Sequence, residues 1–235
     1  MGETRPLAVL LAYEEEAAIG RTVEELRREL PEAALLVVDD GSSDRTAAAA
    51  RAAGARVARH PFNLGVAAAE ATGLRYALRH GHPAVVRMDG HGQHDPKSAR
   101  ELLGAVERGA ELAVGSRFLE REGFQSSAAR RAGNALLARI VSSLCGQSVT
   151  DPTSGLRAFG GRAIPFFAER FPHDYPEPES LVWAHRAGLC VEEIPVQMRP
   201  RLAGRSSLTP WKSGYYMVKV TLALGLELAR GRSRA

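Results

Sequence analysis

The sequence predicts an α/β fold with an open, mostly parallel sheet flanked by helices. Short apolar runs alternate with amphipathic stretches as far as about Ser116, which is the pattern of repeated βαβ units. Several apolar runs end directly in polar clusters, as strands do at the ligand-binding edge of such a sheet. With 235 residues, 45% hydrophobic and 25% charged, the chain can bury the core of one large domain. Disordered, collagen-like and coiled-coil proteins are excluded.

The strands expected in the first half of the chain are fully apolar or short runs: Leu7 to Ala12, Leu35 to Val38, Arg56 to Ala58, Ala84 to Met88 and Leu112 to Ser116. Helices are expected between them. The first runs from Ile19 to Leu30, the second is capped by Ser43 or Asp44 and ends at Gly54, the third runs from Val66 to about Arg79, and the fourth begins at Pro96. Pro31, Gly54, Gly81 and Pro83 end or separate these elements. The order of elements therefore favours parallel strands joined by helical crossovers.

After Arg117 the alternation becomes less regular. We expect a helix from Ala129 to Leu144, a turn from Asp151 to Gly155, a helix near Ser180 to Ala187, and a last strand from Cys190 to Val196. The two cysteines, Cys145 and Cys190, lie far apart in apolar runs and predict buried thiols without a disulfide.

The charge is unevenly distributed. The formal net charge is +4, but the first 198 residues carry 23 basic and 26 acidic residues, and the rest carry eight basic residues and one acidic residue. A basic protein of this kind invites a nucleic-acid interpretation, but an acidic body with a basic tail argues against it. The N-terminus predicts no signal peptide, and no window is apolar enough to span a membrane. We expect a cytoplasmic protein, peripheral at most on the inner face of a membrane.

Three polar clusters follow predicted strands: Tyr13 with Glu14, Asp39 to Asp44, and Asp89 to Asp95. Because the carboxyl ends of parallel strands share one edge, we expect these clusters to converge. No glycine-rich phosphate loop and no GxGxxG fingerprint follows the first strand, which excludes those two nucleotide sites. Carboxylates hold a diphosphate only through a bridging divalent cation, so a metal-dependent site is predicted.

Four segments carry motifs in a specific order: Val37 to Thr46, Asn63 to Gly65, Met88 to Pro96, and Val114 to Arg117. Together they resemble the family 2 glycosyltransferases with the GT-A fold, and most of all the dolichyl-phosphate mannose or glucose synthase-like members. The resemblance covers residues 7 to about 210. It implies a nucleotide-sugar donor, one Mg²⁺ or Mn²⁺, and transfer with inversion at the anomeric carbon. It also implies a nucleotide-sugar-binding half (1–116), an acceptor half (117–210) and a C-terminal amphipathic, basic segment (211–235).

The resemblance implies roles for individual residues. The expected nucleotide-sugar contacts are Tyr13, Glu14, Asp39, Asp40, Gly41, Asn63, Asp89 and Arg205. Asp39 would read the base, and Asp40 and Gly41 would support it. Asp89 and His91 occupy the positions of the Asp-x-Asp motif, and Gln93 is a further candidate ligand. Catalysis would be a single displacement in which metal and basic side chains neutralise the leaving diphosphate.

Two positions depart from the family pattern, because Glu14 stands where Asn is usual and His91 where Asp is usual. The site resembles that of the polypeptide N-acetylgalactosaminyltransferases, which use Asp-x-His, so the change need not abolish metal binding. Imidazole is a softer ligand than carboxylate and favours Mn²⁺ over Mg²⁺. We also expect affinity to fall as the imidazole takes up a proton.

The acceptor decides which groups act next. A polyprenyl phosphate is already an anion and needs only an arginine clamp, for which Arg117 and Arg131 match the family's positions. A sugar or other hydroxyl acceptor needs a carboxylate base. The candidate bases are Asp151, Asp174, Glu177 and Glu179. Arg201 and Arg205 resemble the family's basic loop, which closes over the diphosphate.

The apolar segment Tyr215 to Ala229 has basic residues on both sides. It is too short to span a bilayer, and it would lie in a membrane interface or pack on the domain or a homodimer partner.

Two further interpretations of the function compete with a glycosyltransferase. A nucleotidyltransferase would carry a basic glycine-rich loop after the first strand, where this chain has Glu14 to Glu16. A non-catalytic sugar-nucleotide-binding module would bind without turnover.

Overall fold

The computed structural model describes residues 4–120 and 128–199, together with 219, 220, 222 and 224. The strands are β1 (Leu7–Ala12), β2 (Ala34–Asp39), β3 (Arg56–Arg59), β4 (Ala84–Asp89), β5 (Leu112–Ser116), β6 (Arg157–Gly160) and β7 (Val191–Pro195). The helices are α1 (Ile19–Glu29), α2 (Thr46–Ala52), α3 (Val66–His80), α4 (Pro96–Glu107), α5 (Ala128–Cys145), α6 (Ala163–Glu169) and α7 (Pro176–Arg186).

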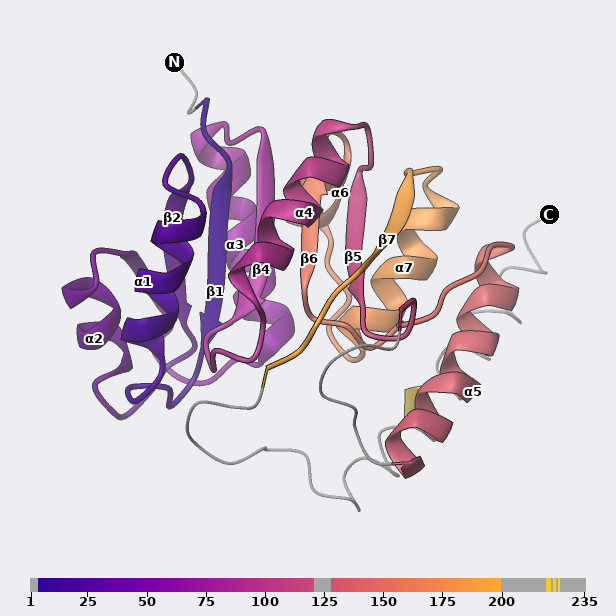
Figure 1. The fold of residues 1–235 in the computed structure, drawn as a ribbon, viewed down its shortest axis with the longest axis horizontal. Helices are drawn as coiled ribbons and strands as arrows, with labels where there is room; N and C mark the ends of the chain where they lie inside the picture. Colours follow the sequence, from indigo (N-terminus) through magenta and orange to yellow (C-terminus); the bar gives the residue numbers. More distant parts are fainter. Residues whose placement is uncertain (1–3, 121–127, 200–218, 221, 223, 225–235) are drawn as a thin grey trace.

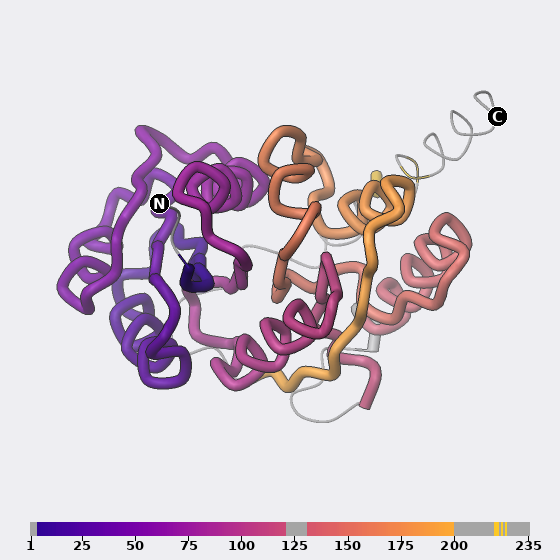
Figure 2. The backbone as a smooth tube through the Cα atoms, turned by 90° about the horizontal axis from the view of Figure 1, so that it is seen from above, coloured from indigo at the N-terminus to yellow at the C-terminus, as the bar shows by residue number. Residues whose placement is uncertain are grey.

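The strands of the described chain form a seven-stranded sheet in the order β3-β2-β1-β4-β6-β5-β7 (Figure 1). All neighbouring pairs are parallel except those made by β6, which runs antiparallel to β4 and to β5. The predicted α/β class with an open, mostly parallel sheet is therefore confirmed. Figure 2 shows the helices on both sides of the sheet, with the first helices at one end and α5 at the other.

Each face of the sheet has its own hydrophobic core. Alternate side chains of a strand point to opposite faces, and in β1 the odd positions from Leu7 to Leu11 pack with α3, α5, α6 and α7. The even positions from Ala8 to Ala12 pack with α1, α2 and α4. A strand covered on both faces has no polar alternation, which explains the continuous apolar runs in the sequence.

Two elements of the second half were not predicted, β6 and α6. Strand β6 is four residues long and contains a buried arginine, Arg157, so it has no apolar run to reveal it. Helix α7 begins at Pro176, four residues before the expected Ser180, because proline suits the first position of a helix. The expectation that both thiols are buried is wrong for Cys190, which is exposed.

Only four residues of the C-terminal segment are described. Val220 and Leu224 are fully buried in the core that contains α5 and α7, whereas Leu222 is 62% exposed. At these positions the segment packs on the domain, which is one of the two arrangements expected from the sequence. Arg201, Arg205 and the rest of this segment lie outside the described residues. In the part of the chain that the structure describes, no helix combines the length and the apolar character needed to cross a bilayer.

Candidate active site

The three polar clusters predicted from the sequence follow β1, β2 and β4, and Arg117 follows β5. The carboxyl ends of these four strands share one edge of the sheet. Antiparallel β6 enters the sheet at this edge, so the loop that precedes it, residues 151–156, joins the same region. The expected convergence of these clusters is therefore consistent with the topology.

Asp39, at the end of β2, is fully buried. Its Oδ1 accepts a hydrogen bond from the backbone N–H of Ser42 at 3.0 Å, and its Oδ2 lies 3.1 Å from Nε of Arg59. Arg59 also donates to the carbonyl of Ser42 at 2.6 Å. Asp39 is thus held in one orientation by the following turn and by β3.

Asp40 holds a loop. Its two oxygens accept hydrogen bonds from the backbone N–H groups of Leu64, at 2.9 Å, and Gly65, at 2.8 Å. His60 Nδ1 lies 2.7 Å from the same carboxylate. These contacts position the turn that contains Asn63. Gly41 has a φ of +76°, and a Cβ there would lie 2.6 Å from Cα of Phe62, so glycine lets the two loops meet.

Glu14 has the left-handed φ of +56°, the one positive value at a described non-glycine residue. Its carboxylate accepts from the backbone N–H of Ser43 at 2.7 Å and from its hydroxyl at 2.8 Å. Its own N–H donates to Ser42 Oγ at 3.0 Å. Tyr13, just before it, is 49% exposed beside this turn. The loops that follow β1 and β2 are therefore tied together.

Asp89 ends β4 and faces two imidazoles. Its Oδ2 lies 3.3 Å from His91 Nε2 and 3.7 Å from His94 Nε2, and its Oδ1 lies 3.0 Å from Nη2 of Arg87. Burial opposes ionisation of Asp89, but Arg87 and the hydrogen bond from His91 hold its pKa well below the usual range. Burial lowers the pKa of His94 to about 4. Asp89 is therefore an anion beside a neutral His94.

Asp89 and His91 fit as part of a divalent-cation site. The 3.3 Å between Oδ2 and Nε2 is close to the separation of adjacent ligands, about 3 Å, in an octahedron with bonds of about 2.1 Å. No group of three His, Cys, Asp or Glu side chains suited to a metal occurs among the described residues. The remaining ligands would have to be the Gln93 amide, donor phosphates or water.

The loop of Gln93 and His94 pairs with the chain that follows β7. Arg199 N–H donates to the carbonyl of Gln93 at 2.8 Å, and His94 forms an antiparallel bridge with Met198. The Arg199 guanidinium lies 2.9 Å from Asp95 Oδ1, which caps α4. In Figure 1 this stretch crosses the lower edge of the sheet toward β4. The basic segment that begins at Arg199 therefore starts beside Asp89 and His91.

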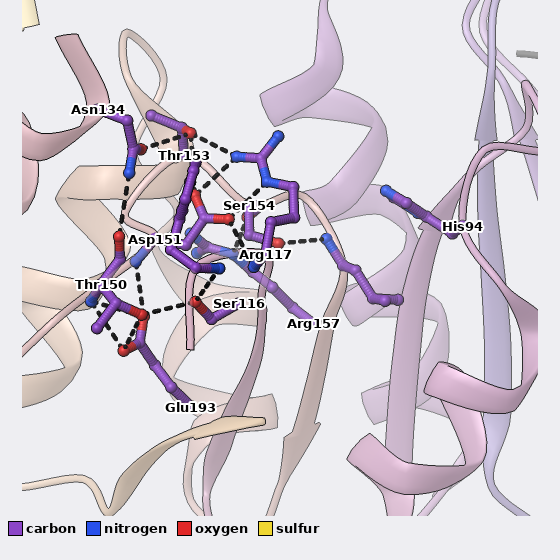
Figure 3. A network of polar contacts seen from close by, with 12 residues as sticks. His94, Ser116, Arg117, Asn134, Thr150, Asp151, Thr153, Ser154, Arg157 and Glu193 are labelled. Atoms are coloured by element: carbon purple, nitrogen blue, oxygen red, sulfur yellow. Dashed lines mark hydrogen bonds and ion pairs between the residues drawn. The ribbon is translucent and has the colours of Figure 1, made fainter. Parts of the chain in front are cut away.

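On the other side of this edge, Arg117 is locked to Asp151 (Figure 3). Nε and Nη2 of Arg117 donate to the two oxygens of Asp151 at 2.6 and 2.7 Å, and Nη2 also donates to Thr153 at 2.8 Å. Burial opposes the charge of Arg117, but the bonds to Asp151 raise its pKa. Asp151 is fully buried and doubly bonded, so it is not an available base.

A wider network fixes the Asp151 turn. Glu193 of β7 accepts from the backbone N–H groups of Thr150 and Asp151 at 2.8 and 2.9 Å. Asn134 of α5 donates to the carbonyl of Thr150 at 3.0 Å. Arg131 is exposed one helical turn before Asn134 on α5. Figure 3 shows His94 directed toward the Arg117 network from the opposite side of the view.

Two of the acidic candidates around the start of α7, Asp174 and Glu177, differ in their surroundings. Asp174 is exposed, and no contact within the described chain joins it to the groups above. Glu177 is half-buried at the first turn of α7, and its charge acts on both Arg87 and Arg117. The structure therefore brings Glu177, but not Asp174, toward Asp89.

Comparison with known proteins decides the family. The model of glycosyl transferase family 2 matches residues 8–159, which include the four ordered motif segments between Val37 and Arg117. The chain belongs to glycosyl transferase family 2. It is 30% identical to polyprenol monophosphomannose synthase of Mycolicibacterium smegmatis, over 97% of this chain and 91% of the relative. It is 31% identical to undecaprenyl-phosphate mannosyltransferase of Micrococcus luteus, over 92% and 93%.

Among solved structures, this glycosyltransferase is similar to glucosyl-3-phosphoglycerate synthase of Mycobacterium tuberculosis, in a complex with Mn²⁺, UDP-glucose and phosphoglyceric acid. The TM-score is 0.71 at 21% identity, with 95% of this chain and 79% of that chain covered. This likeness confirms the GT-A type of fold and, at this identity, nothing finer.

Sequence reasoning missed several residues of the glycosyltransferase's candidate site. Arg59 lies in a short edge strand, and Glu193 lies in a strand without a motif. Arg87 and Glu70 are charged residues inside otherwise apolar patterns, which is the one signal that could have revealed them.

Proposed function

We propose that this glycosyltransferase moves a sugar from a nucleotide-sugar donor to a polyprenyl phosphate, with inversion and with a divalent cation at Asp89 and His91. The choice of a phosphate acceptor rests on Arg117. Its Nε and Nη2 donate to buried Asp151, and within the described residues its Nη1 is available to bind a phosphate. A planar guanidinium held in this way suits an anionic oxygen better than a neutral hydroxyl. The names of two relatives, a polyprenol monophosphomannose synthase and an undecaprenyl-phosphate mannosyltransferase, support the same class.

The donor would lie across the ends of β1, β2 and β4. Tyr13, Glu14, Asp39 and Asn63 would face the nucleoside, and Asp40 and Gly41 would act by holding the two loops together. A carboxylate that is held in one orientation, like that of Asp39, can accept a hydrogen bond from the N–H group of a base. UDP-glucose in a structural neighbour supports a nucleotide sugar without indicating which one this chain uses.

In the reaction, an oxygen of the lipid phosphate attacks the anomeric carbon from the face opposite the diphosphate. The bond from that carbon to the diphosphate oxygen breaks, and its electron pair leaves with the nucleoside diphosphate. A divalent cation bound at Asp89 and His91 would neutralise the negative charge that grows on this leaving group. Arg117 and Arg131 would orient the attacking phosphate, and Arg201 and Arg205 would approach the diphosphate from the segment that follows Arg199. No side chain has to remove a proton.

A second candidate, transfer to a sugar or other hydroxyl, is favoured by one observation. Glu177 lies close enough for its charge to act on both Arg87 and Arg117, and an ionised carboxylate here would accept the proton of a hydroxyl acceptor. Asp151 cannot take this role, because both of its oxygens accept from Arg117.

The deciding experiment has two steps. A panel of nucleoside diphosphates, with and without Mn²⁺, identifies the donor class, and the matching nucleotide sugar is then offered with undecaprenyl phosphate or with soluble sugars. We expect Arg117→Lys to lower kcat/KM for the lipid phosphate about 100-fold, and Glu177→Gln to have a much smaller effect. Loss of activity in Glu177→Gln with soluble sugars as the better acceptors would establish the second candidate. Binding without any turnover would leave a non-catalytic module.

The same proposal places the protein at the membrane face that carries its lipid acceptor. Leu119 and Leu136, which follow Arg117 and Arg131 in the chain, are 43% and 53% exposed. Exposed leucines suit contact with an isoprenoid chain or a bilayer surface. Liposome co-sedimentation of the chain with and without residues 211–235 tests this contact. A homodimer stays a prediction, which sedimentation velocity would test.

A further inference from the structure

A buried ion pair lies directly behind Asp89. Before Asp89, strand β4 is apolar except for Arg87, which is 2% exposed, and Glu70 of α3 is 3% exposed. Arg87 Nε lies 3.4 Å from Glu70 Oε2, and Nη2 lies 3.0 Å from Asp89 Oδ1. Nη1 donates to the carbonyl of Gly155. One guanidinium therefore joins α3, the end of β4 and the loop before β6.

Stability does not explain this arrangement. Two charges removed from water are often no more stable than apolar side chains of the same volume. Glu70 Oε1 and Arg87 Nε are buried, and neither has a hydrogen-bond partner among the described residues, so the pair at 3.4 Å is an ion pair without a hydrogen bond. Burial raises the pKa of Glu70 even though Arg87 and Arg157 act in the opposite direction. A buried pair that leaves two polar atoms without hydrogen bonds is destabilising, so its role lies in what it does at Asp89.

The pair orients the carboxylate of Asp89. Because Arg87 binds Oδ1, the oxygen turned toward His91 is Oδ2. Glu70 in turn keeps the guanidinium of Arg87 in place from the opposite side. Groups that hydrogen-bond to a metal-ligating carboxylate fix its orientation and so increase metal affinity. A second buried arginine, Arg157, bonds instead to the carbonyls of Ser154 and Glu177.

We propose that Arg87 and Glu70 are positioning residues that hold Asp89 with a single oxygen presented to the cation. The proposal rests on the proposed function, in which Asp89 is a metal ligand. Gly155 is part of the same arrangement, because a Cβ at this position would collide with the guanidinium of Arg87.

The test removes both charges together, so that neither is left buried without a partner. The variant Glu70→Leu with Arg87→Met is compared with the wild-type chain by circular dichroism, thermal unfolding and electron paramagnetic resonance titration of Mn²⁺. UDP or GDP is present in the titration, whichever binds the wild-type chain. We expect a folded protein whose Mn²⁺ dissociation constant is about 10- to 100-fold higher.

The matched control removes an Arg–Glu pair elsewhere. Arg162 and Glu111 pair at 2.8 Å on the surface, and Glu111→Leu with Arg162→Met should leave Mn²⁺ binding unchanged. Arg87→Lys is the second variant, because one ammonium cannot reach Glu70, Asp89 and Gly155 together. Arg87→Lys should weaken Mn²⁺ binding about 10-fold, and this variant tests the positioning role if the double variant does not fold.

The outcomes separate the two ideas. Wild-type Mn²⁺ affinity in a folded double variant, or in Arg87→Lys, overturns the positioning role and leaves the proposed function intact. If the wild-type chain binds no Mn²⁺ with either nucleotide, the metal site itself is overturned, and the role of the pair with it.

Discussion

At the scale of single residues, backbone conformation explains one departure from the family pattern. Glu14 stands where the family usually has Asn, and its φ of +56° is one that Asn adopts more readily than Glu. The glutamate retains this conformation and uses its longer side chain to bind the N–H and hydroxyl of Ser43. The turn is thus preserved although the residue has changed.

Gly41→Ala should be strongly destabilising. Both the left-handed φ of +76° and the Phe62 backbone oppose a Cβ, so we expect a loss of more than about 3 kcal/mol of unfolding free energy. Gly146→Ala is the control, since its φ is +64° but nothing lies within 4 Å of the added atom. It should cost about 1 kcal/mol. Equal losses in urea unfolding would show that the contact with Phe62 is unimportant.

His91→Asp should change the preferred cation. The wild-type chain is expected to be more active with Mn²⁺ than with Mg²⁺, because imidazole is a softer ligand than carboxylate. A second carboxylate should raise the activity with Mg²⁺ relative to Mn²⁺ by about 10-fold. Steady-state rates at saturating concentrations of each ion measure the ratio. An unchanged ratio would argue against His91 as a ligand.

At the scale of elements, α5 joins the Thr150 turn to the core. Asn134 reaches the Thr150 turn, and Leu137, Val141 and Cys145 are buried against the rest of the domain. The thiol of Cys145 lies 3.9 Å from the carbonyl of Leu181 in α7. Arg131 is therefore carried by a helix whose position is fixed at several points.

The reactivity of the thiols reports on this packing. Burial raises the pKa of Cys145 to about 11, so the thiol stays protonated at pH 8, whereas Cys190 is exposed. Because only a thiolate reacts rapidly, Ellman's reagent should modify one thiol per native chain at pH 8 and two after denaturation. Because the folded chain holds the Cys145 proton more tightly than the unfolded chain, the free energy of unfolding should fall as the pH rises above the ordinary pKa of a thiol. Rapid modification of both thiols in the native chain would show that α5 opens.

The C-terminal segment offers a direct comparison of buried and exposed positions. Leu224→Ala should lower the unfolding free energy by about 2–5 kcal/mol, because Leu224 is fully buried. Leu222→Ala should change it by less than about 0.5 kcal/mol, because Leu222 is 62% exposed. Thermal unfolding measures both. If the two variants melt together, the segment does not contribute to the core.

At the scale of the whole molecule, the sequence was most informative where pattern and chemistry coincide. Three of the five strands of the first half, β1, β2 and β4, end in the polar clusters that reveal them, and the order of elements predicts the shared edge. Strand β6 and the groups behind Asp89 could not be predicted, because short antiparallel pairing and buried ion pairs depend on contacts between distant segments. Arg87 and Gly155 are 68 residues apart in the chain.

The position of β6 also limits how this protein can be recombined. The strand comes from the second half of the sequence but lies between β4 and β5 of the first half. A chimaera joined near residue 116 would therefore exchange part of the middle of the sheet, and with it the carbonyl that receives Arg87. Swapping acceptor modules between relatives should succeed only when β4 and the loop before β6 are transferred together. The two halves of the chain thus share one sheet and cannot be exchanged as separate units.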